Sequence, residues 1–351
     1  MRWIGTSRYV YNKSLNYVKT NGNNELNFFQ LRNKFVTAKN NPEVQEWQKE
    51  TPKDIRAGAI RDMVKAYKTS FSNLKAGNIH KFNLGYRSKK KNNSIEIPKS
   101  SIKFKDGQLS LYNTYLGSTI KVSKDKSLTN LEIKHDCRLR NVRGEWYLIV
   151  PVNVSGNEKV PPLDVCALDP GVRKFQTLYS EYKIQKIMIK KELIAKLQSK
   201  LDLFRSLKNR KLISKQSYKR RERKIYNKLD NLIDDLHYKT ICNITNDYKL
   251  IFLPIFETQE IVKKNKFGNR DLLQLKHYLF RTRFQNKCNL LKNTKVIICT
   301  EEFTSKTCSR CGKVNYIGAA EVFRCSECKL KADRDINASR NIFIKCTSEH
   351  S

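Results

Sequence analysis

Two pairs of closely spaced cysteines near the C-terminal end constrain the fold of this chain more than any other feature. The spacing is Cys308-x2-Cys311, followed after thirteen residues by Cys325-x2-Cys328. Two C-x2-C knuckles at this separation are typical of a zinc ribbon, in which four thiolates surround one tetrahedral Zn²⁺. Gly312 follows the first knuckle, where a tight turn often needs relaxed backbone geometry. Because four protein ligands leave no open position, we predict a structural Zn²⁺ rather than a catalytic one.

The four cysteines have one alternative interpretation, which is two disulfides. The other six of the ten cysteines are scattered, mostly beside apolar residues, and no signal-peptide h-region stands at the start of the chain. Scattered cysteines in a long chain without a signal peptide are typical of reduced, buried thiols. We therefore expect zinc, in an intracellular protein whose compartment (cytoplasm, nucleus or viral factory) the sequence does not specify.

The net charge points to a polyanionic partner. The 351 residues include 70 Lys and Arg against 33 Asp and Glu, a formal net charge of +37. Such an excess repels itself unless a polyanion is nearby, and nucleic-acid phosphates bind Lys and Arg with release of counterions. An anionic membrane surface is the alternative, but no apolar stretch approaches the roughly 20 residues of a membrane span. We predict nucleic acid as the partner, and no membrane.

The first part of the chain divides into a helical segment and a β-rich module. Apolar residues recur at helical spacing within 1–20 and 51–76. From about 80 to 154, short alternating stretches predict strands, with Asp106-Gly107 as a tight hairpin turn. The expected strands are 82–86, 94–97, 102–105, 109–112, 119–122, 131–134 and 146–152. We predict a small barrel, with the basic run 87–91 on a loop that contacts phosphate.

Residues 155–162 have the composition of a linker, and the chain beyond them alternates strands and helices. Within the first long helical stretch, two apolar stripes flank a dense basic run at 205–224, which indicates two helices joined by a basic elbow. The order of elements is typical of an α/β domain with a mainly parallel sheet. The expected strands are 165–168, 175–179, 249–256 and 295–300, and the expected helical stretches are 187–248 and 270–291.

Three carboxylates stand where such a sheet builds its sites. Asp169 ends one apolar strand, Glu257 ends another, and Asp335 lies just ahead of a predicted helix start. Strand ends and helix N-termini form the ligand crevice of an α/β sheet, so we expect the three to converge. Clustered carboxylates repel one another unless a cation lies among them, and hard oxygen ligands favour Mg²⁺ or Mn²⁺. Two such ions about 4 Å apart would activate water and stabilise the leaving oxygen of a phosphodiester.

Each carboxylate also has an ordinary structural explanation. An Asp before Pro-Gly, as at Asp169, is typical of a turn, and Asp335 alone is typical of a helix N-cap. Asp333, two residues earlier, is a rival for the third ligand. The residues alone leave these alternatives open.

At these residues the sequence resembles the TnpB proteins and their eukaryotic and giant-virus relatives, the Fanzor proteins. Leu168–Thr177 resembles the first RuvC motif, and Leu253–Gln259 resembles the second motif in its viral form. Phe303–Gly312 is similar to the start of the family's zinc ribbon, and Cys325–Ile342 is similar to the third motif. Residues 51–104 resemble the family's upstream region, so the resemblance covers nearly the whole chain.

The resemblance implies a domain organisation. An RNase H-like (RuvC) nuclease domain would span residues 163–351 and be interrupted by the four-cysteine zinc ribbon at about 303–332. A β-barrel-like module would span 81–155, with a helical recognition segment over 1–80 as its insertion. In this family the ligand is the Asp immediately before x-Asn, which selects Asp335.

The resemblance also implies an activity, which is RNA-guided, Mg²⁺-dependent cleavage of double-stranded DNA. Asp169, Glu257 and Asp335 would be the catalytic metal ligands, and a guide RNA and target DNA would be the partners. Such proteins are often called transposases, and type V CRISPR effectors share the nuclease core.

Three features depart from the family pattern. The start of the chain resembles an internal segment, so we expect an initial strand and helix to be missing and guide binding to be weakened. Residues 180–191 are shorter than usual, and Lys329 follows Cys328 where glycine is common. The alternative function is therefore a catalytically impaired remnant or a domesticated nucleic-acid-binding zinc-ribbon protein. A zinc-ribbon transcription factor is a third class, but it would not need three separated acidic motifs.

Overall fold

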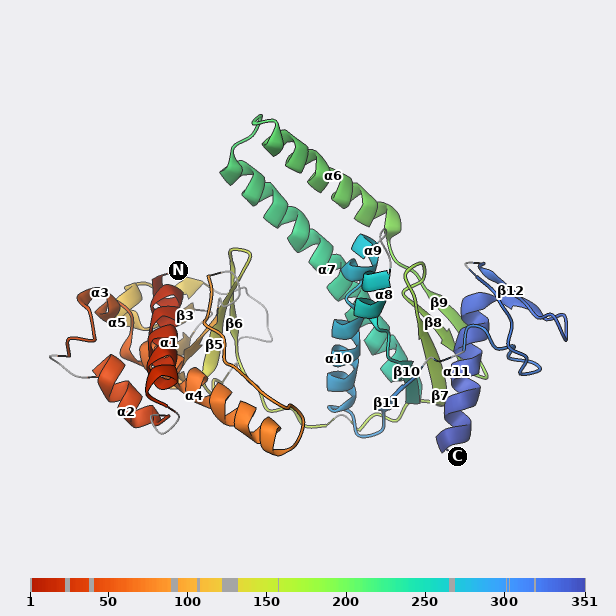
Figure 1. Cartoon of the computed structure of the whole chain (residues 1–351), viewed down its shortest axis with the longest axis horizontal. Helices are drawn as coiled ribbons and strands as arrows, with labels where there is room; N and C mark the ends of the chain where they lie inside the picture. Colours follow the sequence, from red (N-terminus) through yellow and green to blue (C-terminus); the bar gives the residue numbers. More distant parts are fainter. Residues whose placement is uncertain are drawn as a thin grey trace. The chain divides into compact units, whose positions relative to one another are not determined.

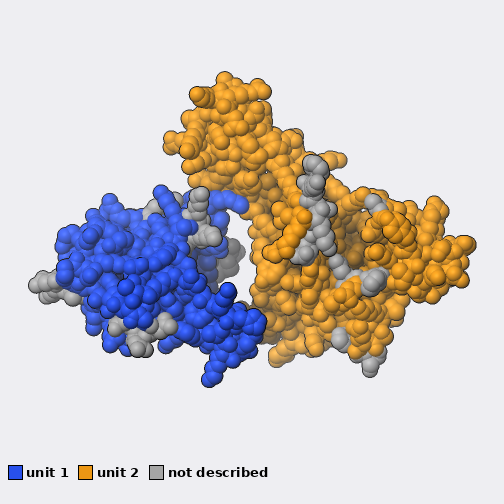
Figure 2. All heavy atoms as spheres, viewed as in Figure 1, with its two compact units in different colours: residues 1–153 blue, residues 154–351 orange. Residues whose placement is uncertain are grey.

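The structure is a computed structural model that divides into two compact units, residues 1–153 and 154–351 (Figure 1; Figure 2). The predicted linker, residues 155–162, lies at the start of the second unit. The residues that the structure describes are 2–22, 26–37, 41–89, 94–105, 108–121, 132–156, 158–264, 269–300, 302, 304–318 and 320–350.

Two long helices organise the first unit, and both were predicted. α1 (Arg2–Asn21) and α4 (Lys53–Lys75) pack together through apolar residues at helical spacing, among them Leu15, Ile60 and Met63, which are fully buried. Amphipathic stripes of this kind gain most of their stability from burial against a partner. The shorter helices of this region are α2 (Phe28–Arg32), η2 (Asn33–Thr37) and α3 (Glu46–Lys49).

The strands that the structure describes in the first unit form two three-stranded antiparallel sheets, β1-β5-β6 and β2-β3-β4. Ile4 of α1 and Ile55 of α4 pack with buried residues of both sheets. The Asp106-Gly107 turn lies outside the described residues, and closure into a barrel stays a prediction. The bounds are β1 (Ser94–Ile97), η3 (Lys99–Ser101), β2 (Ile102–Lys105), β3 (Gln108–Leu111), α5 (Asn113–Leu116), β4 (Ile120–Lys121), β5 (Cys137–Val142) and β6 (Glu145–Ile149).

Two strand predictions in this unit were wrong. Residues 82–86 form no strand, and their side chains contact α1: Lys19 donates to the Asn83 side chain at 2.8 Å, and Asn16 accepts from the Tyr86 hydroxyl at 2.8 Å. Residues 132–134 are irregular, and Leu131 lies outside the described residues. β5 was missed because two arginines alternate with its few apolar residues.

The second unit is built on a five-stranded sheet in the order β11-β10-β7-β8-β9. β10 pairs in parallel with β7 and β11, whereas β7-β8 and β8-β9 are antiparallel. The sheet is therefore mixed, which corrects the expectation of a mainly parallel one. Short connections force β7, β8 and β9 to run back and forth. The bounds are β7 (Leu163–Pro170), β8 (Gln176–Tyr179), β9 (Ile184–Ile187), β10 (Tyr248–Pro254) and β11 (Lys295–Cys299).

Helices cover both faces of this sheet. Alternate residues of β7 point to opposite faces, so Cys166 and Leu168 join one core cluster while Ala167 joins another. The first cluster includes residues of α6 (Lys191–Asn209), α7 (Lys215–Asp247) and α10 (His277–Cys288). The second includes Ile342 and Cys346 of α11 (Arg334–His350). Asp169 shares the face of Ala167, which is the face that α11 covers.

α6 and α7 form the predicted pair of helices with a basic elbow, and they extend beyond the sheet side by side (Figure 1). Leu201 and Leu229 are buried in the common core. The Ser214 side chain caps α7 by accepting from the Ser217 amide at 3.1 Å, and Lys211 has a left-handed backbone (φ +61°) that turns the chain.

The helical stretch predicted at 270–291 is broken. α9 (Asn269–Gln274) ends before Lys276, whose left-handed backbone (φ +51°) precedes α10. Lys276 forms an ion pair with Asp230 of α7 at 2.6 Å. α8 (Thr258–Lys264) precedes this pair of helices. Within the described residues, no helix combines the length and the apolar character that a membrane span requires.

Candidate functional site

The four predicted cysteines come together in the structure. One sulfur ligand atom from each lies within 4.8 Å of all the others. The Cys308 and Cys328 sulfurs are 3.5 Å apart, and the Cys311 and Cys325 sulfurs are 3.6 Å apart. Sulfurs on a tetrahedron with 2.3 Å zinc–sulfur bonds are about 3.8 Å apart. The four-thiol donor set therefore fits one Zn²⁺.

The knuckles are held by tight turns and a short hairpin. β12 (Val322–Arg324) pairs with β13 (Lys331–Asp333), and the fully buried Phe323 packs against Cys308 and Cys325. Gly312 (φ +78°) and Lys329 (φ +61°) each follow a knuckle with a left-handed backbone. This explains why glycine suits both places, and it leaves Lys329 in a conformation that a side chain disfavours.

Polar groups around Cys325 favour its thiolate, which is the form that binds metal. At Cys328, by contrast, a backbone hydrogen bond is outweighed by burial and the neighbouring sulfurs, which raise its pKa to about 12. Partial burial raises the pKa of Cys325, but hydrogen bonds from the Cys328 and Glu327 backbone outweigh it and lower this pKa to about 6. The Asn315 amide group also donates to the Cys325 sulfur at 3.7 Å, and its oxygen accepts from the Ser326 amide at 2.8 Å. Asn315 was not identified from the sequence, since no motif marks it.

Two of the three predicted carboxylates line one cavity. Asp169 near the end of β7 and Asp335 in the first turn of α11 line a cavity of about 800 Å³, hereafter the carboxylate cavity. Glu257 is exposed just before α8 and does not line this cavity, but the residue before it, Phe256, does. The structure therefore brings Asp169 and Asp335 together and leaves Glu257 beside the cavity wall.

Asp333 and Asp335 have different surroundings. One Asp333 oxygen accepts from the Asp335 and Ile336 amides at 3.0 and 3.3 Å, so Asp333 caps the N-terminus of α11. Its carboxylate also pairs with Lys174 at 2.9 Å and Lys186 at 2.8 Å. Burial raises the pKa of Asp333, but the lysines and the Ile336 amide outweigh burial and lower it to about 2.

Asp335 is not used as a cap and lines the cavity, with Lys174 at 2.7 Å as its ionic partner. Lys174 thus lies between both aspartates, and these carboxylates outweigh its burial and raise its pKa. Lys174 belongs to the run that resembles the first RuvC motif, whereas Lys186 was not singled out because β9 was not predicted. The Lys174 ammonium group shows that the Asp335 carboxylate has a cationic partner in the cavity.

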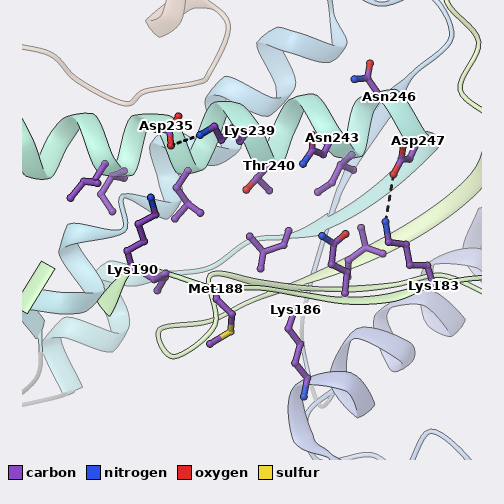
Figure 3. A pocket seen from close by; sticks show the side chains of 18 of the residues that line it. Lys183, Lys186, Met188, Lys190, Asp235, Lys239, Thr240, Asn243, Asn246 and Asp247 are labelled. Atoms are coloured by element: carbon purple, nitrogen blue, oxygen red, sulfur yellow. Dashed lines mark hydrogen bonds and ion pairs between the residues drawn. The ribbon is translucent and has the colours of Figure 1, made fainter. Parts of the chain in front are cut away.

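A second cavity, of about 590 Å³, lies between the C-terminal half of α7 and β9 (Figure 3). Asn243 and Thr240 of α7 line one side of it, and Lys183 reaches towards Asp247 of the same helix, whereas the Lys186 side chain points away from α7 (Figure 3). Two ion pairs hold its rim, Lys183–Asp247 at 3.8 Å and Lys239–Asp235 at 2.9 Å. Met188 lines both this cavity and the carboxylate cavity, so the two adjoin. The lysines contributed from the β9 side are Lys183, Lys186 and Lys190.

Comparisons with known proteins agree with these features. Residues 277–342, which include the four-cysteine cluster, match the family model described as Cas12f1-like, TNB domain. In fold, the chain is similar to the Cas12f1 chain of a solved Cas12f1–sgRNA–target DNA complex, with a TM-score of 0.56 and 14% identity over 97% of this chain and 81% of that one. At this identity the likeness shows the fold alone.

Relatives in sequence carry transposase and endonuclease names. The chain is 31% identical over 371 residues to putative transposase A625R of Paramecium bursaria Chlorella virus 1, covering 99% of this chain and 83% of that protein. It is 27% identical to TnpB-like protein L79 of Acanthamoeba polyphaga mimivirus, of which it spans 54%. It is 23% identical to putative RNA-guided DNA endonuclease InsQ of Escherichia coli K12, of which it spans 87%. The similarity thus runs through nearly the whole chain, and the chain belongs to the TnpB family.

Proposed function

We propose that this chain is an RNA-guided, Mg²⁺- or Mn²⁺-dependent DNA endonuclease. The observation that carries the proposal is the convergence of Asp169 and Asp335 on one cavity, with Glu257 directly after a residue of its wall. In the proposed assignment, the second unit is the RuvC (RNase H-like) domain. An antiparallel meander, β7-β8-β9, extended by the parallel strands β10 and β11 supports it.

The donor set suits a hard divalent cation, since the three carboxylates offer only oxygen ligands. Asp169, Glu257 and Asp335 would hold Mg²⁺ or Mn²⁺, which when bound supplies Lewis-acid stabilisation of charge at a scissile phosphodiester. Lys174, which also lines the cavity, forms ion pairs with Asp335 at 2.7 Å and with the neighbouring Asp333 at 2.9 Å. The zinc ribbon would hold Zn²⁺ as a structural ion.

Basic side chains beside the carboxylates would bind the sugar–phosphate backbone. Arg173 and Lys191 line the carboxylate cavity itself, and the lysines of the second cavity continue this basic surface across Met188. Phosphate contacts of this kind position a nucleic acid without reading its sequence. Base pairing with a guide RNA would supply the sequence specificity.

The test begins with RNA that copurifies with the full chain, which is sequenced and used to reconstitute cleavage of a matching duplex. The cleavage rate should fall by several orders of magnitude in each of three variants, while nucleic-acid binding stays intact. The variants are Asp169→Ala, Glu257→Ala and Asp335→Ala. Asp164→Ala is the matched control, because Asp164 lies on the same strand but pairs with Lys249 at 2.7 Å, away from the cavity. Absence of metal-dependent cleavage by the wild type would favour the alternative, a catalytically impaired nucleic-acid-binding protein.

A further inference from the structure

A small cavity of about 10 Å³ lies behind the carboxylate cavity, lined in part by α10 and hereafter called the rear cavity. Pro170 and Phe256 line both cavities, so they form the wall between them. Pro170 directly follows Asp169, and Phe256 directly precedes Glu257. The packing of the rear cavity therefore fixes the two backbone segments that present these carboxylates.

Two buried polar side chains line the rear cavity without direct partners. Gln176 is 0% exposed and His277 is 4% exposed. Neither amide atom of Gln176 and neither ring nitrogen of His277 makes a hydrogen bond of good geometry to a residue that the structure describes. The Gly171 backbone approaches His277 closely enough to favour its protonated form, but it does not replace such a bond. Leaving buried donors and acceptors unpaired is strongly unfavourable, so a small polar ligand is expected between them.

A second buried histidine of this core, His237, does form hydrogen bonds, so the lack of them at His277 is not common to the buried histidines of this unit. His237 and His277 stack on the Phe175 ring, with centroids 5.1 and 5.3 Å away. His237 has partners at both nitrogens, since Arg283 donates to Nδ1 at 3.1 Å and Nε2 donates to the Leu275 carbonyl at 2.9 Å. His277, which lines the rear cavity, has no comparable hydrogen bond of good geometry at either nitrogen to a residue that the structure describes.

The chemistry of the cavity suits water. Burial lowers the pKa of His277 to about 4, so at neutral pH its ring offers one donor and one acceptor. The Gln176 amide adds donors and an acceptor. The cavity volume of about 10 Å³ is close to the room that a single water molecule needs, and buried waters typically make about three hydrogen bonds.

We propose that the rear cavity binds one ordered water molecule held by Gln176 and His277, and that these two side chains are positioning residues for Asp169 and Glu257. The water links β8 to the start of α10 on the rear side of the wall that Pro170 and Phe256 form. The role in metal binding rests on the proposed function, whereas the water itself does not.

A crystal structure of the full chain at a resolution that shows ordered water tests the first part. We expect one water within hydrogen-bond distance of the Gln176 amide and a His277 ring nitrogen. A direct hydrogen bond between the two side chains, or a rear cavity filled by another side chain, overturns the proposal.

Mn²⁺ affinity, measured by electron paramagnetic resonance, tests the second part apart from cleavage. Gln176→Met and His277→Phe keep most of the volume and remove the polar atoms. Each should raise the Mn²⁺ dissociation constant about tenfold, as loss of a group that orients a metal ligand does. Tyr248→Phe is the matched control, because it removes another buried hydrogen bond of this unit, to Ser180 at 3.0 Å, away from the carboxylates. It should lower stability and leave Mn²⁺ affinity unchanged.

The double variant Gln176→Met/His277→Phe is the control for destabilisation of the single variants. The double variant removes both polar side chains, so neither is left buried without a hydrogen-bond partner. Its loss of stability should therefore be smaller than the sum of the two single losses, while its Mn²⁺ affinity stays low. Wild-type Mn²⁺ affinity in all three variants overturns the positioning role. If the wild type binds Mn²⁺ through Asp169 but cleaves no nucleic acid, the proposed function fails and this inference stands.

Discussion

At the scale of single residues, two aspartates that are two positions apart make different contacts. Asp333 caps α11 and pairs with Lys174 and Lys186, whereas Asp335 lines the carboxylate cavity. Asp335→Asn should therefore lower cleavage by several orders of magnitude, with little loss of stability. Asp333→Asn keeps a good capping side chain but loses two ion pairs, so it should cost about 1–2 kcal/mol in stability and retain most cleavage.

Cleavage rates at saturating Mg²⁺ and unfolding in urea, measured on both variants, check this assignment. Full activity in Asp335→Asn together with loss in Asp333→Asn would show that Asp333 is the metal ligand.

Lys329 is a second residue whose role is decided locally. It has a left-handed backbone (φ +61°) after the second knuckle, and its ammonium group donates to the Ser326 carbonyl at 2.7 Å. Lys329→Gly should stabilise the ribbon by up to about 1 kcal/mol, since glycine adopts this conformation without steric cost. Thermal unfolding of the zinc-loaded chain measures the change. Lys331→Gly in β13 is the control and should destabilise; a loss in Lys329→Gly would show that the Ser326 contact outweighs the strain.

At the scale of elements, α11 connects the four-cysteine region, the predicted zinc ribbon, to the candidate catalytic carboxylate. Asn337 accepts from the Ser309 amide at 3.0 Å and donates to the Thr307 carbonyl at 2.8 Å. Asn341 donates to the same Thr307 carbonyl at 2.7 Å. The helix that holds the start of the ribbon also carries Asp335 in its first turn, so disorder in the ribbon should reach the carboxylate cavity.

Elemental analysis should therefore find about one Zn per chain, because a closed four-ligand site holds one ion. A zinc-selective chelator or Cys308→Ser should unfold the ribbon and lower cleavage even at saturating Mg²⁺. Cys242→Ser, at an exposed cysteine of α7, is the control and should change neither. Unchanged cleavage in zinc-free protein would contradict the coupling.

The α6–α7 hairpin carries a basic end suited to a polyanion. Arg210, Lys215 and Arg220 are all exposed. Changing these three to Gln should lower the slope of log affinity against log salt by about 2 to 3, because each phosphate contact contributes about 0.7 to 0.9. A salt titration of nucleic-acid binding measures it.

The matched control for the hairpin replaces three lysines that each pair with a carboxylate. Their effect on the slope should be small, since their charge is already neutralised within the protein. Equal effects of the two triple variants would mean that binding follows net charge and not the hairpin. The control lysines are Lys49, Lys249 and Lys292.

At the scale of the whole molecule, two buried histidines contribute to how stability depends on pH. Burial lowers the pKa values of His237 and His277 to about 4, below the value near 6.5 of an exposed histidine. Between these values the unfolded chain binds a proton at each site and the folded chain does not, so acidification favours unfolding. The free energy of unfolding should fall by up to roughly 1.4 kcal/mol per pH unit for each histidine, and these groups add no further loss below about pH 4.

Urea unfolding between pH 7 and 4 measures this slope. His237→Gln should make it shallower by about one proton, and His80→Gln, at an exposed position, should keep the wild-type slope. Identical slopes in wild type and His237→Gln would show that His237 binds its proton equally well in the folded and the unfolded chain, and would contradict the effect of burial.

Local patterns in the sequence were enough for the features that depend on near neighbours. The ligand spacing of the ribbon requires only two tight turns, and the structure gathers all four sulfurs. The long helices α1 and α4 follow from apolar periodicity, and β7 and β10 follow from short apolar runs that stop at turn residues. Motifs in family order also identified Asp169, Glu257 and Asp335, whose catalytic role stays a prediction.

Tertiary structure decided what depends on contacts between distant segments. Asp333 and Asp335 have the same side chain, and only the positions of Lys174 and Lys186 distinguish a cap from a cavity residue. The antiparallel direction of β8 and β9 follows from their pairing with neighbouring strands, and local propensity does not predict this pairing. The rear cavity exists because strand β8 and helix α10 meet behind one wall; no local pattern marks His277, and the motif that contains Gln176 does not predict its burial there. Sequence periodicity fixes which face of an element is apolar, but burial of a polar group depends on which elements meet there.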